Sequence, residues 1–237
     1  MEINCEKCNN QGFVFKEFLD KEGNAYKMAI DCDCLSKRKY VAAARHVGLG
    51  DDIFNKTFET FETSDAWQEV VKNKAIEFCC QNKAKAFYIG GQVGSGKTHI
   101  CTAIINQLIK QGKQCHYVIW NDIVTRLKQL TYEDEAKYHE YLNQLKFAEV
   151  LFIDDFFKNS ISSKADIDKA FQIINMRYIN AKTQPIITLI SSEKTIQELM
   201  DIDEAIASRI YELTNSGEYS IKIMKDKAKN YRLKNIG

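Results

Sequence analysis

A glycine-rich run between residues 91 and 98 has the residue types and spacing of a phosphate-binding loop. It fits the pattern G-x-x-x-x-G-K-[ST], in which backbone N–H groups surround a polyphosphate. Lys97 is expected to reach the β- and γ-phosphates, and the Thr98 hydroxyl is expected to hold Mg²⁺. The nucleotide-binding residues predicted from the motif and the residue after it are Gly91, Gln92, Val93, Gly94, Ser95, Gly96, Lys97, Thr98 and His99.

The sequence on either side of this loop predicts the elements that such a loop needs. Residues 86–89 are apolar and aromatic and predict a strand, whereas residues 99–110 carry apolar side chains at helical spacing. A strand, a glycine loop and a helix N-terminus together direct backbone N–H groups and the positive helix end at phosphate. The alternative, a chance glycine loop with an unrelated lysine, leaves this setting unexplained.

A second motif supplies carboxylates. Four apolar residues, 150–153, are followed by Asp154 and Asp155, which are expected at the carboxyl end of a buried strand, where such sheets collect ligands. Asp154 is predicted to support the Mg²⁺ that bridges the phosphates, and Asp155 to orient or deprotonate the attacking water. Alone, the pattern would indicate a strand that ends in an exposed turn. After a phosphate-binding loop, the two motifs complete each other.

Four of the eight cysteines fall within the first 34 residues, as the pair Cys5 and Cys8 and the pair Cys32 and Cys34. Residues 12–30 predict two strands joined by a turn, and a hairpin would bring both pairs to the same end. Four thiolates in this arrangement predict a zinc-ribbon-like site with tetrahedral Zn²⁺. The alternative is four small apolar thiols in a core, which so short a segment can hardly bury without a metal.

The rest of the chain alternates strands and helices. Strands are predicted at residues 116–120, 149–153, 186–190 and 219–224, and helices at 65–81, 122–130, 133–146, 164–180, 193–200 and 203–213. This alternation predicts an α/β fold with a parallel sheet and helices on both faces. A glycine-containing boundary at residues 48–52 divides a small N-terminal module, 1–50, from the main domain, 53–237.

The composition of the chain limits which binding partners and which cellular compartment are expected. The 33 Lys and Arg nearly balance the 32 Asp and Glu, so any nucleic-acid surface must be local. No run of about 18 apolar residues predicts a membrane span, and the first residues lack a basic and apolar signal pattern. We therefore expect a cytoplasmic protein, in which a cysteine cluster is more often a metal site than a disulfide framework. Cys79, Cys80, Cys101 and Cys115 are expected to be small core or partly buried residues.

The order of these motifs resembles that of AAA+ ATPases, because the Asp154–Asp155 motif is followed by Ser191 and Ser192 and then by Ala207-Ser208-Arg209. It is most similar to the DnaC/DnaI-type replicative helicase loaders and to the related IstB-type transposition ATPases. The cysteine pairs look like the zinc module of several bacterial and phage loaders, and residues 54–61 look like the segment that leads into their core. The resemblance implies an AAA+ core without a C-terminal lid domain, since 13 residues follow Met224.

The resemblance also implies roles for particular residues. Ser192, or Ser191 beside it, stands where the family has a polar residue, termed sensor 1, that contacts water or the γ-phosphate. Arg209 stands where the family has an arginine finger, which a neighbouring subunit inserts against the γ-phosphate. A serine at a strand end and a surface arginine in a local salt bridge are the alternatives. Arg232 would approach the nucleotide from a basic tail, but a solvated tail is the better explanation of these residues.

The function implied by the resemblance is ATP-dependent loading of a DnaB-type replicative helicase onto single-stranded DNA. ATP or ADP, Mg²⁺ and Zn²⁺ are the expected cofactors, the zinc module would hold the helicase, and the core would self-associate with nucleotide. Residues 121–146 are the implied DNA contact, with Arg126 and Lys128 as candidates, although acidic residues in this stretch argue against it. The alternatives are an IstB-like transposition helper and an ATP-binding switch with little turnover, because Asp155 replaces the more usual Glu.

Overall fold

The computed structural model describes residues 4–158 and 163–233 of the 237-residue chain. The chain divides into two compact units, residues 1–46 and residues 47–237, which are described separately. The boundary predicted at residues 48–52 lies just beyond this division.

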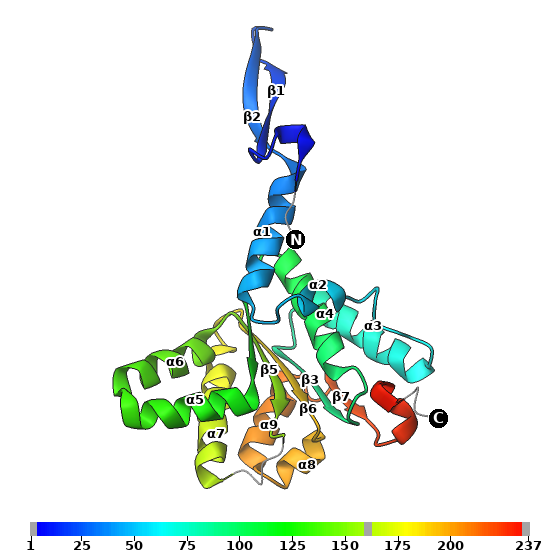
Figure 1. Ribbon diagram of the computed structural model, residues 1–237, viewed down its shortest axis with the longest axis vertical. Coiled ribbons are helices and arrows are strands. Elements are labelled where there is room, and N and C mark those ends of the chain that lie inside the picture. The colour runs from blue at the N-terminus through cyan, green and yellow to red at the C-terminus, as the bar shows by residue number, and fades with distance from the viewer. Residues whose placement is uncertain (1–3, 159–162, 234–237) are drawn as a thin grey trace. The chain divides into compact units, whose positions relative to one another are not determined.

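The first unit is a hairpin followed by a helix (Figure 1). Strand β1 (Phe13–Leu19) pairs antiparallel with β2 (Ala25–Asp31), from Phe13 opposite Asp31 to Leu19 opposite Ala25. A short 3₁₀ helix, η1 (Glu6–Cys8), precedes the hairpin, and α1 (Asp33–His46) follows it. Because the strands are antiparallel, the segments that carry the two cysteine pairs meet at one end of the hairpin.

The second unit alternates strands and helices. Its strands are β3 (Ala86–Gly91), β4 (Cys115–Ile119), β5 (Val150–Phe156), β6 (Ile187–Ser192) and β7 (Ser220–Ile223). Its α-helices are α2 (Asp52–Asn55), α3 (Ala66–Cys80), α4 (Lys97–Lys110), α5 (Trp120–Glu133), α6 (Glu135–Phe147), α7 (Lys164–Asn180), α8 (Ile196–Met200) and α9 (Glu204–Leu213). Two 3₁₀ turns, η2 (Lys227–Lys229) and η3 (Tyr231–Leu233), follow the last strand. Within the described residues, no helix is both long enough and apolar enough to cross a membrane.

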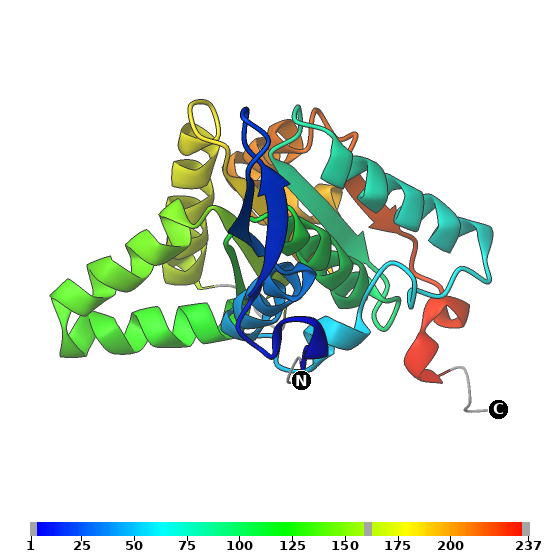
Figure 2. The same ribbon diagram turned by 90° about the horizontal axis from the view of Figure 1, so that it is seen from above.

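The five strands form one parallel sheet in the order β4-β5-β6-β3-β7. The connection through α4 runs along the sheet in one direction, whereas the connections after β4, β5 and β6 run in the other. Because such connections are right-handed, α4 covers one face and α5–α9 cover the opposite face (Figures 1 and 2). Helix α3 packs on α4. The predicted parallel sheet with helices on both faces is confirmed.

Strand β5 lies inside the sheet and is buried along nearly its whole length. Its continuous apolar run is what a strand covered on both faces requires. One face of the sheet shares a core with the inner faces of α5, α6, α7 and α9. In this core the Trp120 ring packs against Phe156 and Phe157, with ring centroids 4.9 and 5.4 Å away.

Two predicted helix starts are wrong, and hydrogen bonds at the helix ends explain why. Helix α3 begins at Ala66 and not at the predicted residue 65, because Asp65 is its N-cap and forms a reciprocal capping box with Gln68. The helix predicted from residue 193 begins later, since Thr195 and Glu198 form a second capping box. The residues before Thr195 therefore lie outside the helix: β6 ends at Ser192, and Glu193 lines the cavity beside it.

A fully buried arginine on α7 joins helix α6 to the sheet. Arg177 donates from its NH1 group to the carbonyls of Leu145 and Ala148 at 3.1 and 2.9 Å. It also donates to the Ile187 carbonyl at 2.6 Å and to the Thr188 hydroxyl at 2.7 Å. Burial lowers the pKa of Arg177 to about 9, and no carboxylate pairs with it in the described part of the chain. Carbonyl dipoles at the C-terminal end of α6 therefore supply most of its compensation.

Replacing Arg177 should destabilise the second unit strongly. Arg177→Met keeps much of the side-chain volume but leaves buried acceptors unpaired, so we expect the free energy of unfolding to fall by about 3 kcal/mol. Urea unfolding followed by circular dichroism measures this change. Arg126→Met, at an exposed position on α5, is the control, with an expected change within about 0.5 kcal/mol. Equal losses in the two variants would show that the buried hydrogen bonds contribute little.

Candidate nucleotide-binding site

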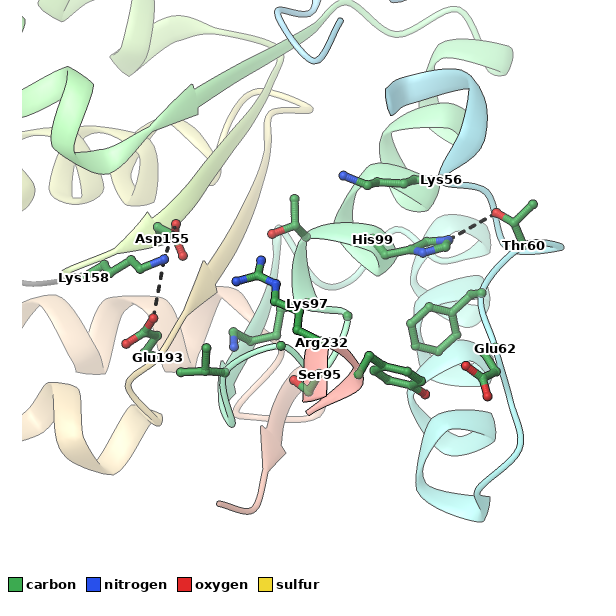
Figure 3. Close-up of a pocket in the computed structure, with 16 residues that line it drawn as sticks. Lys56, Thr60, Glu62, Ser95, Lys97, His99, Asp155, Lys158, Glu193 and Arg232 are labelled. Carbon is green, nitrogen blue, oxygen red and sulfur yellow. Dashed lines mark hydrogen bonds and ion pairs between the residues drawn. The ribbon is translucent and has the colours of Figure 1, made fainter. Parts of the chain in front are cut away.

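The glycine loop joins the end of β3 to the start of α4. Gly94 and Gly96 have φ angles of 69° and 86°, in the left-handed region that glycine adopts without strain. Gly96 is also the N-cap of α4, so the first N–H groups of the helix open toward the loop. Seven consecutive loop and helix residues line a cavity of about 490 Å³, namely Val93, Gly94, Ser95, Gly96, Lys97, Thr98 and His99 (Figure 3). The other two predicted loop residues, Gly91 and Gln92, lie behind this wall and contact Lys97.

The Lys97 side chain is almost completely buried within the loop. Its ammonium group donates to the carbonyls of Gly91 and Gln92 at 3.1 and 2.6 Å. Burial lowers the pKa of Lys97, whereas the nearby carboxylates of Glu193 and Asp155 oppose that shift. The loop thus holds a cation that is poorly compensated by protein groups, and a polyphosphate is suited to compensate it.

The Asp154 carboxylate lies beside the first turn of α4. The Thr98 hydroxyl donates to it, with both carboxylate oxygens 3.1 Å away. The Tyr117 hydroxyl donates to Oδ2 at 3.2 Å, and the Ser191 hydroxyl also donates to the carboxylate. Burial and the neighbouring Asp154 raise the pKa of Tyr117, so its hydroxyl remains a donor. Hydroxyl and carboxylate oxygens placed side by side form the hard-oxygen ligand set that suits Mg²⁺.

A bulge in β5 separates the two aspartates. Ile153 pairs with Ile190 and Phe156 pairs with Ser192, so β5 contains one residue more than β6 over this stretch. Asp155 takes a φ of 54°, a left-handed conformation that is uncommon for a non-glycine residue. Asp155 consequently lines the cavity, whereas Asp154 stays buried against α4.

One lysine bridges two carboxylates on the far side of the cavity. The Lys158 ammonium group lies 3.0 Å from Asp155 Oδ2 and 3.5 Å from Glu193 Oε1 (Figure 3). Asp155, and then Glu193, raise the pKa of Lys158, so the lysine is charged at neutral pH. The candidate general base is therefore held in an ion pair inside the site.

The opposite side of the cavity is formed by the segment that leads into the core. Asn106 of α4 donates to the Ile53 carbonyl at 2.6 Å, and His99 Nε2 lies 3.0 Å from the Thr57 carbonyl. Burial lowers the pKa of His99, which favours a neutral ring whose Nε2–H donates to this carbonyl. The Phe61 ring packs edge-on against the His99 ring, with centroids 5.3 Å apart. These contacts fix an aromatic wall beside the phosphate-binding loop.

The two candidate serines of β6 have different environments. Ser191 contacts Asp154, as described above. The Ser192 hydroxyl, which is fully buried, donates to the Phe156 carbonyl at 2.6 Å and accepts from the Lys194 N–H. The sensor 1 role assigned to Ser192 therefore fits Ser191 better, because successive side chains of a strand point to opposite faces.

Arg209 lies outside the lining of the cavity. Its guanidinium donates to Asn175 Oδ1 at 2.9 Å and to the Ala205 carbonyl at 2.7 Å. It also lies over the Phe171 and Tyr178 rings, 5.0 and 5.7 Å from their centroids. These contacts differ from the local salt bridge considered as the alternative, and they leave the arginine half-buried beside α7.

A sequence model of the IstB-like ATP-binding proteins matches residues 15–235 of the chain. The chain belongs to this family. It is 34% identical over 217 residues to the protein YqaM of Bacillus subtilis, covering 85% of the chain and 66% of YqaM. It is 32% identical over 225 residues to the phage-like element PBSX protein XkdC of the same organism, covering 88% of the chain and 79% of XkdC. The chain thus spans about two thirds of the length of YqaM.

The fold also matches a solved helicase-loader structure. The crystal structure of the DnaC helicase loader is similar with a TM-score of 0.61 and 20% identity, covering 75% of this chain and all of the DnaC chain. This identity is low and supports the fold alone. The expected similarity to IstB-type ATP-binding proteins is confirmed by the family model, and the expected similarity to DnaC-type proteins is confirmed at the level of the fold. The family description supports ATP as the ligand of the loop.

The four N-terminal cysteines form a cluster in the first unit. The Sγ atoms of Cys5, Cys8, Cys32 and Cys34 all lie within 4.8 Å of one another, with Cys5 and Cys32 3.8 Å apart. Tetrahedral Zn²⁺ with Zn–S bonds of about 2.3 Å requires sulfur separations of about 3.8 Å, so the donors fit the ion. The Gly12 N–H lowers the pKa of the Cys8 thiol to about 6, which favours the thiolate that a metal needs.

The candidate DNA contacts are less distinctive. Lys128 pairs with Asp166 at 2.9 Å, and Arg126 is exposed on α5. Their role in binding DNA stays a prediction. In the basic tail, Lys234 lies outside the described residues.

Four residues at the candidate site were missed or undervalued by the sequence analysis. Glu193 directly follows the serine pair and Lys158 follows Asp155 by three positions, so proximity in sequence was their signal. Tyr117 pairs with Phe152 in the neighbouring strand, a contact set by sheet register. Arg232 lines the cavity although it lies about 130 residues after the loop in the sequence. No local sequence pattern predicts that the chain after β7 returns to the loop.

Metal removal should unfold the first unit selectively. The four-cysteine cluster predicts one zinc ion per chain. Because β1 and β2 bury little surface, the hairpin should depend on that ion for its stability. Chelation or Cys8→Ser should therefore abolish the hydrogen-exchange protection of the β1–β2 amides. Metal analysis by mass spectrometry and exchange measurements test this. Nucleotide binding should persist, because every residue that lines the cavity belongs to the second unit. Cys80→Ser, at an exposed position outside the cluster, is the control, and undiminished protection after chelation would contradict a structural metal.

Proposed function

We propose that the chain is an ATP-dependent loader of a DnaB-type replicative helicase onto single-stranded DNA. The observation that carries this proposal is the combination, in one chain, of a DnaC-like nucleotide-binding core with a four-cysteine hairpin that exposes apolar side chains. Family membership alone supports ATP binding, and the hairpin favours the loader over other members.

In the proposed hydrolysis, the core residues act on the phosphates from two sides. Lys97 and the N–H groups of α4 hold the phosphates, and Thr98 with Asp154 would hold Mg²⁺. When bound, the ion would withdraw charge from the phosphate oxygens. Asp155 faces the same cavity and is the group proposed to accept a proton from the attacking water, once its ion pair with Lys158 loosens.

Arg209 is the residue proposed to act on a neighbouring subunit. Ser208 beside it is exposed in the middle of α9, so this part of the helix is accessible to a second copy. The present contacts of Arg209 with Asn175 and two aromatic rings would hold the guanidinium in place between engagements. ATP turnover would then require self-association. The same association is proposed to arrange the subunits along single-stranded DNA.

The hairpin is the proposed helicase-binding surface. Phe15 and Leu19 lie on one face of β1 and are 67% and 70% exposed. Tyr26 and Met28 of β2 are exposed on the other face of the hairpin, because they pair with Phe18 and Lys16. Large apolar side chains gathered on a two-stranded hairpin are costly in water unless a partner covers them. A folded metal cluster at the base would present them in a fixed geometry.

Two other functions have a specific observation in their favour. The IstB-like family match supports a helper ATPase that acts with a transposase. The ion pair between Asp155 and Lys158 supports a switch that binds ATP with little turnover.

Removing the proposed general base should separate binding from turnover. Asp155→Asn keeps the side-chain volume but cannot accept a proton, so we expect ATP hydrolysis to fall by about 100-fold or more. The affinity for a non-hydrolysable ATP analogue should stay within about threefold, because the loop and Asp154 are intact. Phosphate release and calorimetry measure the two quantities. A wild-type protein without turnover, with or without single-stranded DNA, would favour the switch.

The loader proposal is tested by forming the complex directly. The full chain and the DnaB-type helicase of its own genome, mixed with ATP and Mg²⁺, should co-elute in size-exclusion chromatography with light scattering. The double substitution Phe15→Ser and Leu19→Ser should abolish the complex by removing the exposed apolar surface, whereas Lys16→Ser on the same strand should not. If no complex forms with any nucleotide, the loader assignment fails and the transposition helper gains support.

A further inference from the structure

The chain beyond β7 crosses the glycine loop instead of leaving the core. This segment, residues 224–233, is called the C-terminal strap here. Next to it, the Gln92 N–H donates to the Ile223 carbonyl at 3.1 Å. Within the strap, the Asp226 N–H donates to Gln92 Oε1 at 2.8 Å, and the Tyr231 N–H donates to the Gly94 carbonyl at 2.9 Å. Three hydrogen bonds in succession therefore attach this part of the chain to the loop.

The fit between strap and loop is close. A Cβ atom on Gly94 would collide with the Asn230 side-chain amide, so the strap packs directly against the loop at this point. One residue before Asn230, the Lys229 ammonium group lies 5.7 Å from the centroid of the Trp67 ring on α3. The strap is thus seated on both the loop and a neighbouring helix.

This seating brings two strap residues into the lining of the cavity, Tyr231 and Arg232. Burial raises the pKa of Tyr231 to about 12, so its hydroxyl stays neutral. Figure 3 shows the Arg232 guanidinium extending over the loop into the cavity. In the described part of the chain, that guanidinium makes no hydrogen bond or ion pair with protein groups. It remains available to a ligand.

We propose that Arg232 is a phosphate-binding residue of the nucleotide site, and that the strap delivers it so that the site distinguishes ATP from ADP. A planar guanidinium suits two phosphate oxygens at once. The loop backbone and Lys97 supply donors on one side of the phosphates, and Arg232 supplies a charge from above, over the same cavity as Asp155 and Lys158. The proposal rests on the nucleotide-binding part of the proposed function and is independent of helicase loading.

The test is a comparison of ATP and ADP affinities in the full chain. Isothermal titration calorimetry with Mg²⁺ uses the non-hydrolysable analogue AMPPNP in one arm and ADP in the other. Loss of a charged contact should weaken AMPPNP binding to Arg232→Ala by about tenfold or more, and ADP binding by less than about threefold. Arg232→Lys should recover part of the AMPPNP affinity, because it keeps the charge but not the fork.

The matched control is Lys227→Ala, which removes a cation from the same strap at a position outside the cavity lining. It should leave both affinities unchanged. Hydrogen exchange gives a second readout, in which AMPPNP should protect strap amides in the wild type more than in Arg232→Ala. Equal losses for AMPPNP and ADP, or wild-type affinity for both in Arg232→Ala, would overturn the proposal while leaving the nucleotide site intact. Absence of nucleotide binding in the wild type would instead overturn the site and the inference together.

Discussion

The Asp154 carboxylate is the group on which the rest of the site depends. It accepts hydrogen bonds from Thr98 at the start of α4, from Tyr117 on β4 and from Ser191 on β6. A buried carboxylate is tolerated only when such donors surround it. The same three bonds hold the phosphate-binding helix against the carboxyl ends of neighbouring strands. The hydrogen bonds that set the geometry of the site are therefore the same bonds that hold α4 against the ends of the strands.

The bulge after Asp154 follows from that constraint and determines how the second carboxylate is used. With Asp154 directed to α4, a regular strand would turn the next side chain to the opposite face of the sheet. The extra residue and the left-handed φ of Asp155 instead aim its carboxylate into the cavity. There it meets Lys158, which Glu193 also holds. Inside the cavity, the single positive charge of Lys158 thus offsets part of the charge of two carboxylates before any ligand is considered.

Local motifs made the core of the site readable from the sequence, because contiguous residues carry the chemistry. The glycine loop, the aspartate pair and the cysteine pairs each combine residue type with spacing, and strand–helix alternation indicated the parallel sheet. The sequence could not show which of Ser191 and Ser192 contacts Asp154. That contact depends on the register between β5 and β6, which the bulge in β5 shifts. Tyr117 and Arg232 depend on sheet pairing and on the path of the chain after β7. Neither has a signature within its own segment. The capping pair Thr195 and Glu198 was a local signal for the start of α8, yet the helix was predicted from residue 193.

The strap gives a second structural reason for the glycine at position 94 of the loop. A motif explains Gly94 by the close approach of a phosphate, yet here the Asn230 side chain fills the space that a Cβ atom would need. The loop must therefore fit its own C-terminal segment as well as a nucleotide. Because Tyr231 bonds to the Gly94 carbonyl, a shift of the loop on phosphate binding would be transmitted to the strap through a direct hydrogen bond. The C-terminal strap belongs to the nucleotide site in the same physical sense as the loop does, since hydrogen bonds tie the position of each to that of the other.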